Sequence, residues 1–533
     1  MLDTMSNNDQ HVDLGDCMNL GTYLTRSAKF RPDSEAVVCG DSRLTYRELD
    51  DSTNRLASAL MRTGLGIGDA VATFAGNCGE LVVTEMAVCK AGFVRVPVNA
   101  RLGADELGHV LRDANVKTLF VDPAHADVAL KVVADLGLDI AVYDYGNSAP
   151  GADRYADLLA DGLGDPVAVD VTEDAPAVLN YTSGSTGKLK AAVQTYGNRL
   201  ANMRKRLMSP TGAPTDTDRY LAPGPITHAS GMMMLGVLAR GGAVVVLPAF
   251  DTELFLRTIE KERITTTFVV PTMLNMLMDH PAANDVDLSS LRCVGVGGAP
   301  VSPQRLRDAV AMFGPVVMQG YGLGETTSGI TVLTSDDVVR GVESDPELLK
   351  SCGRPVFDTE VRVVDDAGNE LPAGGIGEIV ARGPDCVREY WHEPELSAET
   401  FVDGWVHTGD VGYFRHDGYL FIVDRKKDMI ISGGFNIYCS EVEAALYEHP
   451  AVSGACVVGV PDEKWGEAVK AVVVTRTPVT EDELVEHCAE RLARMKKPRS
   501  IDFVDSLPVN RNGKIDRKSV RECYWAQAAR HVN

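Results

Sequence analysis

The segment Tyr181-Thr-Ser-Gly-Ser-Thr-Gly-Lys-Leu-Lys190 gathers residue types that bind phosphate. Glycines let backbone N–H groups turn toward an anion, hydroxyls add hydrogen-bond donors, and lysines add positive charge. A Ser/Gly-rich flexible connector is the alternative, but a run of small residues with two lysines close behind favours a phosphate loop. The small residues are Thr182, Ser183, Gly184, Ser185, Thr186 and Gly187, and the lysines are Lys188 and Lys190.

This loop does not have the spacing of a Walker motif. A Walker loop has four residues between its glycines and Ser or Thr after its lysine. Here two residues separate Gly184 from Gly187, and Leu189 follows Lys188. The spacing therefore excludes that motif.

The loop resembles the core motif of the acyl-adenylate-forming superfamily, which includes acyl-CoA ligases, luciferases and adenylation domains of peptide synthetases. The usual form is Tyr-Thr-Ser-Gly-(Ser/Thr)-Thr-Gly-x-Pro-Lys-Gly, and this chain departs from it at Leu189 and Ala191. Further motifs match in the expected order over nearly the whole chain. The resemblance implies an AMP- and acyl-binding domain over residues 1–426 and a lid domain over residues 427–533, joined by a hinge at Lys427.

The resemblance implies a nucleotide site that includes the segment Gln319-Gly-Tyr-Gly-Leu-Gly-Glu325. Tyr321 is implied to stack on adenine and Glu325 to bind Mg²⁺, a hard cation that takes oxygen ligands. By itself, a glycine-rich turn with one acid is ordinary. Gly324 is a departure, because relatives carry there a Thr or Ser that reaches the α-phosphate. The other residues implied here are Gly298, Ala299, Pro300, Gly320 and Gly322.

Three charged residues nearer the C-terminus complete the implied nucleotide site. Asp410 matches a ribose contact, since a carboxylate can accept hydrogen bonds from two vicinal hydroxyls; alone, a turn-capping Asp is an equal alternative. Arg425 matches a second contact to ribose and phosphate. Lys514 matches a lysine that neutralises charge developing on the α-phosphate, although most lysines on such loops are simply solvated. The implied catalytic groups are Lys514, Glu325 and Lys190.

The acyl and CoA sites are implied by less specific segments. His228 matches a residue that gates the acyl channel, although a lone histidine is more often structural. The methionines after Gly231 offer a pliable apolar lining, which predicts a bulky hydrophobic or ring-containing acid. No basic residue stands out as a partner for a second charge on this acid. The implied acyl contacts are His228, Gly231, Met232 and Gly297, and the implied pantetheine contacts are Gly433 and Gly434.

The elements that must position these residues belong to two classes. From residue 70 to about 318, short β-rich runs alternate with helical segments, which predicts helix-covered parallel sheets. From about Phe357, strands with short turns predict a small barrel-like subdomain. After Lys427, about a hundred residues have an α+β pattern, a common domain size. We therefore expect an α/β and α+β fold, with a large N-terminal domain and a small mobile C-terminal domain.

Composition limits the partners and the compartment. The 533 residues include 52 Lys and Arg against 75 Asp and Glu, a net charge of −23, which argues against a nucleic-acid partner. No apolar run reaches the length of a membrane span, and the first residues contain no basic segment followed by an apolar one, so we expect a cytoplasmic protein. The 11 cysteines include no Cys-x-x-Cys pair, which favours reduced thiols over a disulfide framework or a zinc site.

Together, these observations predict a two-step acyl-CoA ligase. A carboxylate attacks ATP to give acyl-AMP and pyrophosphate, and the CoA thiol then displaces AMP. The cofactors are therefore ATP, coenzyme A and Mg²⁺, and the partners are a small carboxylic acid and CoA. A homodimer is left open. Because Leu189, Ala191 and Gly324 lie where phosphates are handled, an alternative is a ligase that only thioesterifies a preformed acyl-AMP. A non-catalytic nucleotide-binding homologue is a less favoured alternative.

Overall fold

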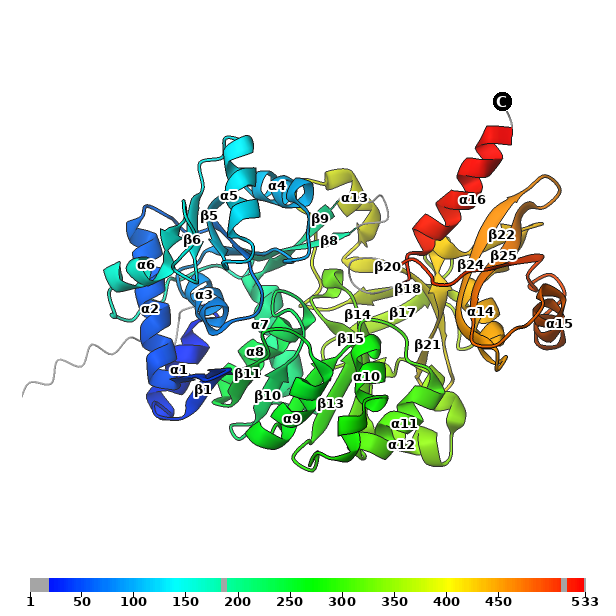
Figure 1. Cartoon of the computed structure of the whole chain (residues 1–533), viewed down its shortest axis with the longest axis horizontal. Coiled ribbons are helices and arrows are strands. Elements are labelled where there is room, and N and C mark those ends of the chain that lie inside the picture. The colour runs from blue at the N-terminus through cyan, green and yellow to red at the C-terminus, as the bar shows by residue number, and fades with distance from the viewer. Residues whose placement is uncertain (1–18, 184–188, 510–514, 532–533) are drawn as a thin grey trace, which may run out of the picture. The chain divides into compact units, whose positions relative to one another are not determined.

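The computed structural model describes residues 19–183, 189–509 and 515–531, in two compact units (Figure 1). The first unit contains Met1–Leu349, Pro355–Glu360 and Arg382–Val406. The second unit contains Lys350–Arg354, Val361–Ala381 and His407–Asn533. The predicted site residues Gly184, Ser185, Thr186, Gly187 and Lys514 lie outside the described residues.

A seven-stranded sheet carries the strand that leads into the phosphate loop. Adjacent strands of this sheet run parallel, except for the last two, β8 and β9, which pair antiparallel. Strands of a parallel sheet are covered on both faces and are therefore apolar throughout, and the central strand β3 is buried at every position. In sheet order, the strands are β7 (Asp153–Arg154), β6 (Ala141–Asp144), β5 (Val116–Val121), β3 (Ala70–Phe74), β4 (Val94–Pro97), β8 (Pro176–Ser183) and β9 (Leu189–Thr195).

A nine-stranded sheet carries the segments predicted to contact adenine. Its central strands are parallel. Toward the two ends of the sheet, β2 pairs antiparallel with β1 and β15 pairs antiparallel with β14. The predicted alternation of strands and helices is thus confirmed. In sheet order, the strands are β16 (Arg354–Pro355), β15 (Gly329–Leu333), β14 (Val317–Gly322), β13 (Cys293–Gly297), β12 (Thr266–Val269), β10 (Arg219–Ala222), β11 (Ala243–Val246), β1 (Glu35–Cys39) and β2 (Ser42–Thr45).

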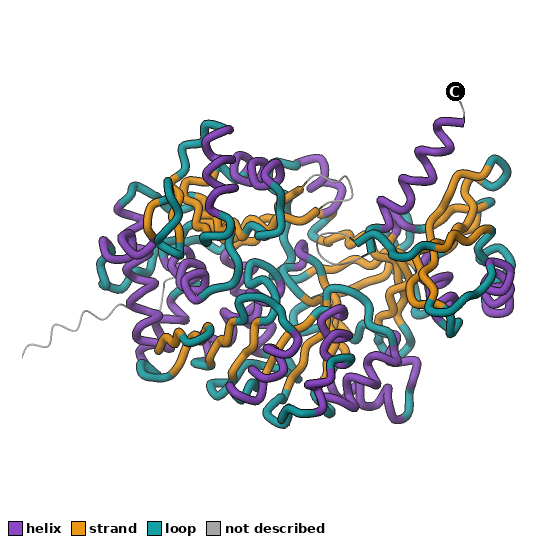
Figure 2. Tube along the Cα trace, in the orientation of Figure 1, coloured by secondary structure: helices purple, strands orange, loops and turns teal. Residues whose placement is uncertain are grey.

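Helices pack around both sheets of the first unit (Figure 2). The helix α2 illustrates how the sequence sets a boundary: Thr45 and Glu48 form a capping box at its start, which satisfies two backbone N–H groups that the helix leaves unpaired. The α-helices are α1 (Thr22–Phe30), α2 (Tyr46–Arg62), α3 (Gly79–Lys90), α4 (Ala104–Asp113), α5 (Ala126–Asp135), α6 (Tyr155–Asp161), α7 (Tyr196–Leu207), α8 (Ala229–Arg240), α9 (Thr252–Glu262), α10 (Pro271–Met278), α11 (Pro303–Phe313), α12 (Ser335–Glu343) and α13 (Pro394–Thr400). The short 3-10 helices are η1 (Pro281–Asn284), η2 (Gly324–Thr326) and η3 (Pro346–Lys350).

The strands on either side of the phosphate loop differ from the expectation. The sequence predicts a turn that leads from a strand into a helix, whereas β9 begins at Leu189 and pairs antiparallel with β8. The helix α7 follows only after β9. The strands β8 and β9 are therefore the two paired strands of a β-hairpin.

The second unit contains the predicted meander and the α+β part. In one five-stranded sheet, the strands are β17 (Glu360–Val364), β18 (Gly377–Arg382), β20 (Trp405–Phe414), β19 (Phe401–Val402) and β21 (Leu420–Arg425), of which β19 belongs to the first unit. The other sheet contains β23 (Phe435–Ile437), β22 (Ile430–Ser432), β25 (Gly466–Thr475), β24 (Val452–Asp462) and β26 (Ser500–Phe503). The helices are η4 (Lys426–Asp428), α14 (Cys439–Tyr447), α15 (Glu481–Arg491) and α16 (Arg517–His531). The predicted fold class is confirmed, while the domain boundary at Lys427 and the mobility of the lid stay predictions.

Two expectations about the whole chain can be compared with these elements. Among the residues that the structure describes, no helix is both long enough and apolar enough to cross a membrane. The cysteines in the same residues are all free thiols.

Candidate functional site

Lys190, Glu325 and Tyr390 meet in the first unit, although they are far apart in sequence. The strand β9 carries Lys190, the 3-10 helix η2 carries Glu325, and Tyr390 precedes α13. The Lys190 Nζ lies 3.8 Å from Glu325 Oε1 and 3.7 Å from the centre of the Tyr390 ring. The Tyr390 hydroxyl donates a 2.6 Å hydrogen bond to the same Oε1. Burial and the neighbouring Glu325 carboxylate raise the pKa of Tyr390, so its hydroxyl keeps the proton that it donates.

The backbone on which Tyr390 lies is fixed against the phosphate-loop hairpin. Val387 N donates to Glu325 O at 2.9 Å, and Trp391 N donates to Ala191 O at 2.8 Å. Ala192 and Tyr390 also form an antiparallel bridge. These backbone bonds set the separation of the lysine, the tyrosine and the carboxylate, so their side chains need little reordering to act together.

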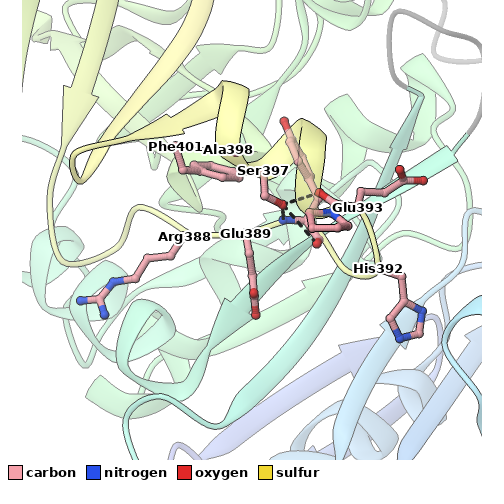
Figure 3. Close-up of a pocket in the computed structure, with 9 residues that line it drawn as sticks. Arg388, Glu389, His392, Glu393, Ser397, Ala398 and Phe401 are labelled. Atoms are coloured by element: carbon pink, nitrogen blue, oxygen red, sulfur yellow. Dashed lines mark hydrogen bonds between the residues drawn. The ribbon is translucent and has the colours of Figure 1, made fainter.

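A pocket of about 440 Å³ lies beside the same backbone (Figure 3). Figure 3 shows the Ser397 hydroxyl among its hydrogen bonds, where it accepts from Tyr390 N at 2.8 Å and donates to Glu393 O at 2.6 Å. Ser397 therefore ties the start of α13 to the segment that carries Tyr390. The pocket is lined by Arg388, Glu389, Tyr390, His392, Glu393, Pro394, Ser397, Ala398 and Phe401.

One face of the β8–β9 hairpin adjoins η2. Thr182 pairs with Lys190 across the hairpin, so their side chains share a face, and Asn180 shares it as well because side chains alternate along a strand. A side chain at Gly324 would place its Cβ 3.0 Å from Asn180 Nδ2 and 3.5 Å from the Thr182 methyl group. A side chain at position 324 would therefore lie against the amide of Asn180 and the methyl group of Thr182.

The two segments predicted to contact adenine are adjacent. The parallel strands β13 and β14 pair Gly297 with Gly320 at their carboxyl ends, the edge at which ligands bind in parallel sheets. Gly298 has a φ of +87°, which favours glycine. A Cβ at Gly322 would lie 2.0 Å from Ser328 O, so no side chain fits there. The structure thus brings together the predicted residues of both segments, which are Gly297, Gly298, Ala299, Pro300, Gly320, Tyr321 and Gly322.

His228 precedes α8, the helix with the methionine run. Burial lowers its pKa to about 4, and the cations Arg95 and Arg101 act in the same direction. The imidazole is therefore neutral at ordinary pH, which suits contact with an apolar group. A Cβ at Gly231 would lie 1.7 Å from Ile226 O, so this glycine allows the helix to pass close to the preceding backbone.

The second unit brings Asp410 and Arg425 together. They are paired residues of β20 and β21, and Arg425 Nε lies 3.4 Å from Asp410 Oδ1. Asp410 is 5% exposed. Lys427 lies in η4, and Gly433 and Gly434 have φ values of +58° and +82° in the turn between β22 and β23. Positive φ values of this kind favour glycine, which explains both residues in this tight turn. Their contact with CoA stays a prediction.

The donor chemistry of Glu325 fits Mg²⁺. No group of three or more His, Cys, Asp or Glu side chains converges on a metal position in the described ranges, but Mg²⁺ is commonly held by one or two carboxylates together with substrate phosphates. Oε1 of Glu325 is held by Tyr390 and Lys190. Within the described parts of the chain, Oε2 receives no hydrogen bond, which leaves this carboxylate able to accept a cation.

Tyr390 is a candidate site residue that no local sequence pattern distinguishes, because it sits in a mixed polar and aromatic run. Its proximity to Lys190 and Glu325 becomes visible only when distant segments are brought together.

Comparison with known proteins identifies the family. The AMP-binding enzyme family matches residues 24–391, and the AMP-binding enzyme C-terminal domain matches residues 441–514. Feruloyl-CoA synthase of an Amycolatopsis species is 40% identical over 506 residues, covering 94% of this chain and 98% of that protein. Medium/long-chain-fatty-acid–CoA ligase FadD8 of Mycobacterium tuberculosis is 36% identical over 529 residues, covering 96% of this chain and 91% of that protein.

A solved structure agrees with this assignment. The amide bond synthetase McbA of Marinactinospora thermotolerans superposes with a TM-score of 0.85 and 32% identity, covering 95% of this chain and 100% of that protein. The order of motifs, the matched domains and the fold therefore agree. The chain belongs to the AMP-binding enzyme family, within the acyl-adenylate-forming superfamily, and is an AMP-forming acid–thiol ligase.

Proposed function

We propose that the protein joins a bulky hydrophobic or ring-containing carboxylic acid to coenzyme A through an acyl-AMP intermediate. The observation that carries this proposal is the cluster of Lys190, Tyr390 and Glu325 beside Thr182. It combines a cation for phosphate, a carboxylate for Mg²⁺ and hydroxyl donors within one fixed framework. The relatives named as CoA ligases support CoA as the acceptor.

The first half-reaction uses residues of the first unit. Bound Mg²⁺ would neutralise phosphate charge during attack of the carboxylate on ATP. In our proposal, Glu325 holds this ion, and Lys190 adds a positive charge beside the phosphates. Tyr321 and the glycines of β13 and β14 receive the adenine. The neutral His228 and the methionines of α8 surround the acyl group.

The second half-reaction requires the lid. We propose that Asp410 binds the ribose hydroxyls with Arg425 beside it. The lid then turns about Lys427, so that the pantetheine arm passes along Gly433 and Gly434. Lys514, outside the described residues, is proposed to serve adenylation before this rotation. A cytoplasmic location and a homodimer also stay proposals.

A ligase that only thioesterifies a supplied acyl-AMP stays the second candidate, because Leu189, Ala191 and Gly324 depart from the family motif. The proximity of the Asn180 amide to Gly324 favours retained adenylation, since this polar group remains where the hydroxyl is missing.

One assay separates the candidates. The protein receives either an acid with ATP or a synthetic acyl-AMP, each with CoA, over a panel of aliphatic, aromatic and polycyclic acids. Acyl-CoA from both feeds, with pyrophosphate released in the first, supports the proposal. Acyl-CoA from acyl-AMP alone supports the second candidate. Nucleotide binding without acyl-CoA from either feed supports a non-catalytic homologue.

A further inference from the structure

A buried cation lies beside the methionine run of the proposed acyl pocket. Arg206 is on α7, and one of its terminal nitrogens, Nη1, lies against the Sδ of Met233 on α8. Met233 directly follows Met232, which the sequence analysis assigns to the acyl group. The guanidinium therefore contacts, from the neighbouring helix, the methionine run that we propose to surround the acyl group.

The protein gives Arg206 only weak acceptors. Its Nε donates to Asn202 Oδ1 at 3.3 Å, and the sulfur beside Nη1 is a weak acceptor. Among the described residues, no carboxylate forms an ion pair with it. A guanidinium carries five N–H donors, so most of its hydrogen-bonding capacity faces no strong protein acceptor.

The nearest acid already has a partner. Asp385 is fully buried, and its Oδ2 lies 2.6 Å from Lys205 Nζ and accepts from Asn202 Nδ2 at 3.4 Å. Burial lowers the pKa of Arg206, and the neighbouring Tyr220 and Asp385 offset this only in part. The lysine and the arginine together therefore exceed the single negative charge of Asp385.

The position of Arg206 is only partly enclosed. Burial perturbs its guanidinium, but the residue keeps intermediate exposure, as do Met232, Met233 and His228. An enclosed charge is unfavourable unless an oppositely charged or accepting group completes it. A substrate oxygen can supply this group only if it reaches the pocket wall beside Met233.

We propose that Arg206 selects acids that carry an oxygen acceptor, such as a phenol or a second carboxylate, at the end remote from the reacting carboxyl group. This inference rests on the proposed function, and it departs from the expectation that no basic residue stands out as a partner for a second substrate charge. The guanidinium donates to the remote oxygen, while the apolar body of the acid packs against Met232 and Met233. Arg206 is thus a specificity-determining residue and takes no part in bond formation.

Pairs of acids that differ only in the remote oxygen test the proposal. The full-length protein is assayed for acyl-CoA formation with para-hydroxycinnamic against cinnamic acid, and with octanedioic against octanoic acid, and acid binding is measured by calorimetry. We expect the wild type to prefer the oxygen-bearing member of one pair by about ten- to a hundredfold, as for a hydrogen bond to a charged group. The pair that shows the preference identifies the remote group as phenol or carboxylate.

Substitution assigns the preference to this side chain. Arg206→Met should abolish the preference, mainly by raising the KM for the oxygen-bearing acid, and Arg206→Lys should restore part of it. Arg204→Met, at an exposed position of the same helix, should change nothing. Equal use and equal binding of both members of each pair by the wild type would overturn the inference even if the variants fail to fold. Absence of acyl-CoA from every acid would instead count against the proposed function, and calorimetry would still decide the preference.

Discussion

Replacement of Tyr390 by Phe removes the hydroxyl that holds Glu325 and keeps the aromatic ring beside Lys190. The 2.6 Å hydrogen bond ends on a carboxylate, and Tyr390 is 3% exposed, so water replaces it poorly. A hydrogen bond to a charged group contributes about 1.5–3 kcal/mol. Lys190 remains 3.8 Å from the same oxygen and offsets part of this loss. We therefore use the lower limit, about 1.5 kcal/mol, which corresponds to about a tenfold slower adenylation.

The assay separates this effect from general damage. Pyrophosphate release should fall about tenfold, and the Mg²⁺ concentration for half-maximal rate should rise about ten- to a hundredfold, as is typical when a group that orients a metal ligand is lost. Acyl-CoA formation from synthetic acyl-AMP should stay unchanged.

The matched control is Tyr524→Phe. Tyr524 donates a 2.6 Å hydrogen bond to Asp502 in the second unit, so the same chemical change is made away from Glu325. This variant should retain wild-type Mg²⁺ dependence. If Tyr390→Phe also released pyrophosphate at the wild-type rate and kept the wild-type Mg²⁺ dependence, Tyr390 could not be the residue that orients Glu325.

Three further changes probe the rest of the site. Because the pKa of His228 is lowered to about 4, the imidazole is uncharged between about pH 6 and 8. His228→Asn should therefore change activity without changing the pH profile in that range. Loss of a titration step near neutral pH in this variant would contradict a neutral His228. Gly231→Ala should destabilise the protein by more than about 2 kcal/mol, since its Cβ would lie 1.7 Å from Ile226 O. In the control Gly236→Ala, the Cβ meets only Pro214 at 3.5 Å, so the melting temperature should not fall. Equal melting temperatures of the two variants would refute the close packing at Gly231. Lys427→Pro should stiffen the hinge and slow thioester formation more than adenylation, and an equal loss in both half-reactions would argue against rotation about this residue.

The sequence predicts the sheets and helices well because their patterns are local. Apolar β-rich runs alternate with helical segments, and capping residues such as Thr45 mark where helices begin. The strand β9 is missed because Lys190-Ala-Ala-Val carries a weak strand signal. Its conformation comes from pairing with β8 and with the backbone around Tyr390.

The site is predicted less completely than the fold. Family motifs reveal Lys190 and Glu325, since each lies in a recognisable segment. Tyr390 lies 65 positions after Glu325, and no spacing rule joins them. Arg206 reads in sequence as one of several basic residues on a solvated helix end, and only its packing against Met233 reveals an enclosed charge.

The hairpin pairing has a consequence for how this protein could be engineered. Thr182 and Lys190 oppose each other in the ladder, so the register of the two strands determines the face of the sheet on which the lysine lies. A register slip of one residue turns a side chain to the opposite face of a sheet. Insertions or deletions that move the pairing by one position would aim Lys190 away from Glu325, whereas substitutions that keep the chain length leave the lysine aligned.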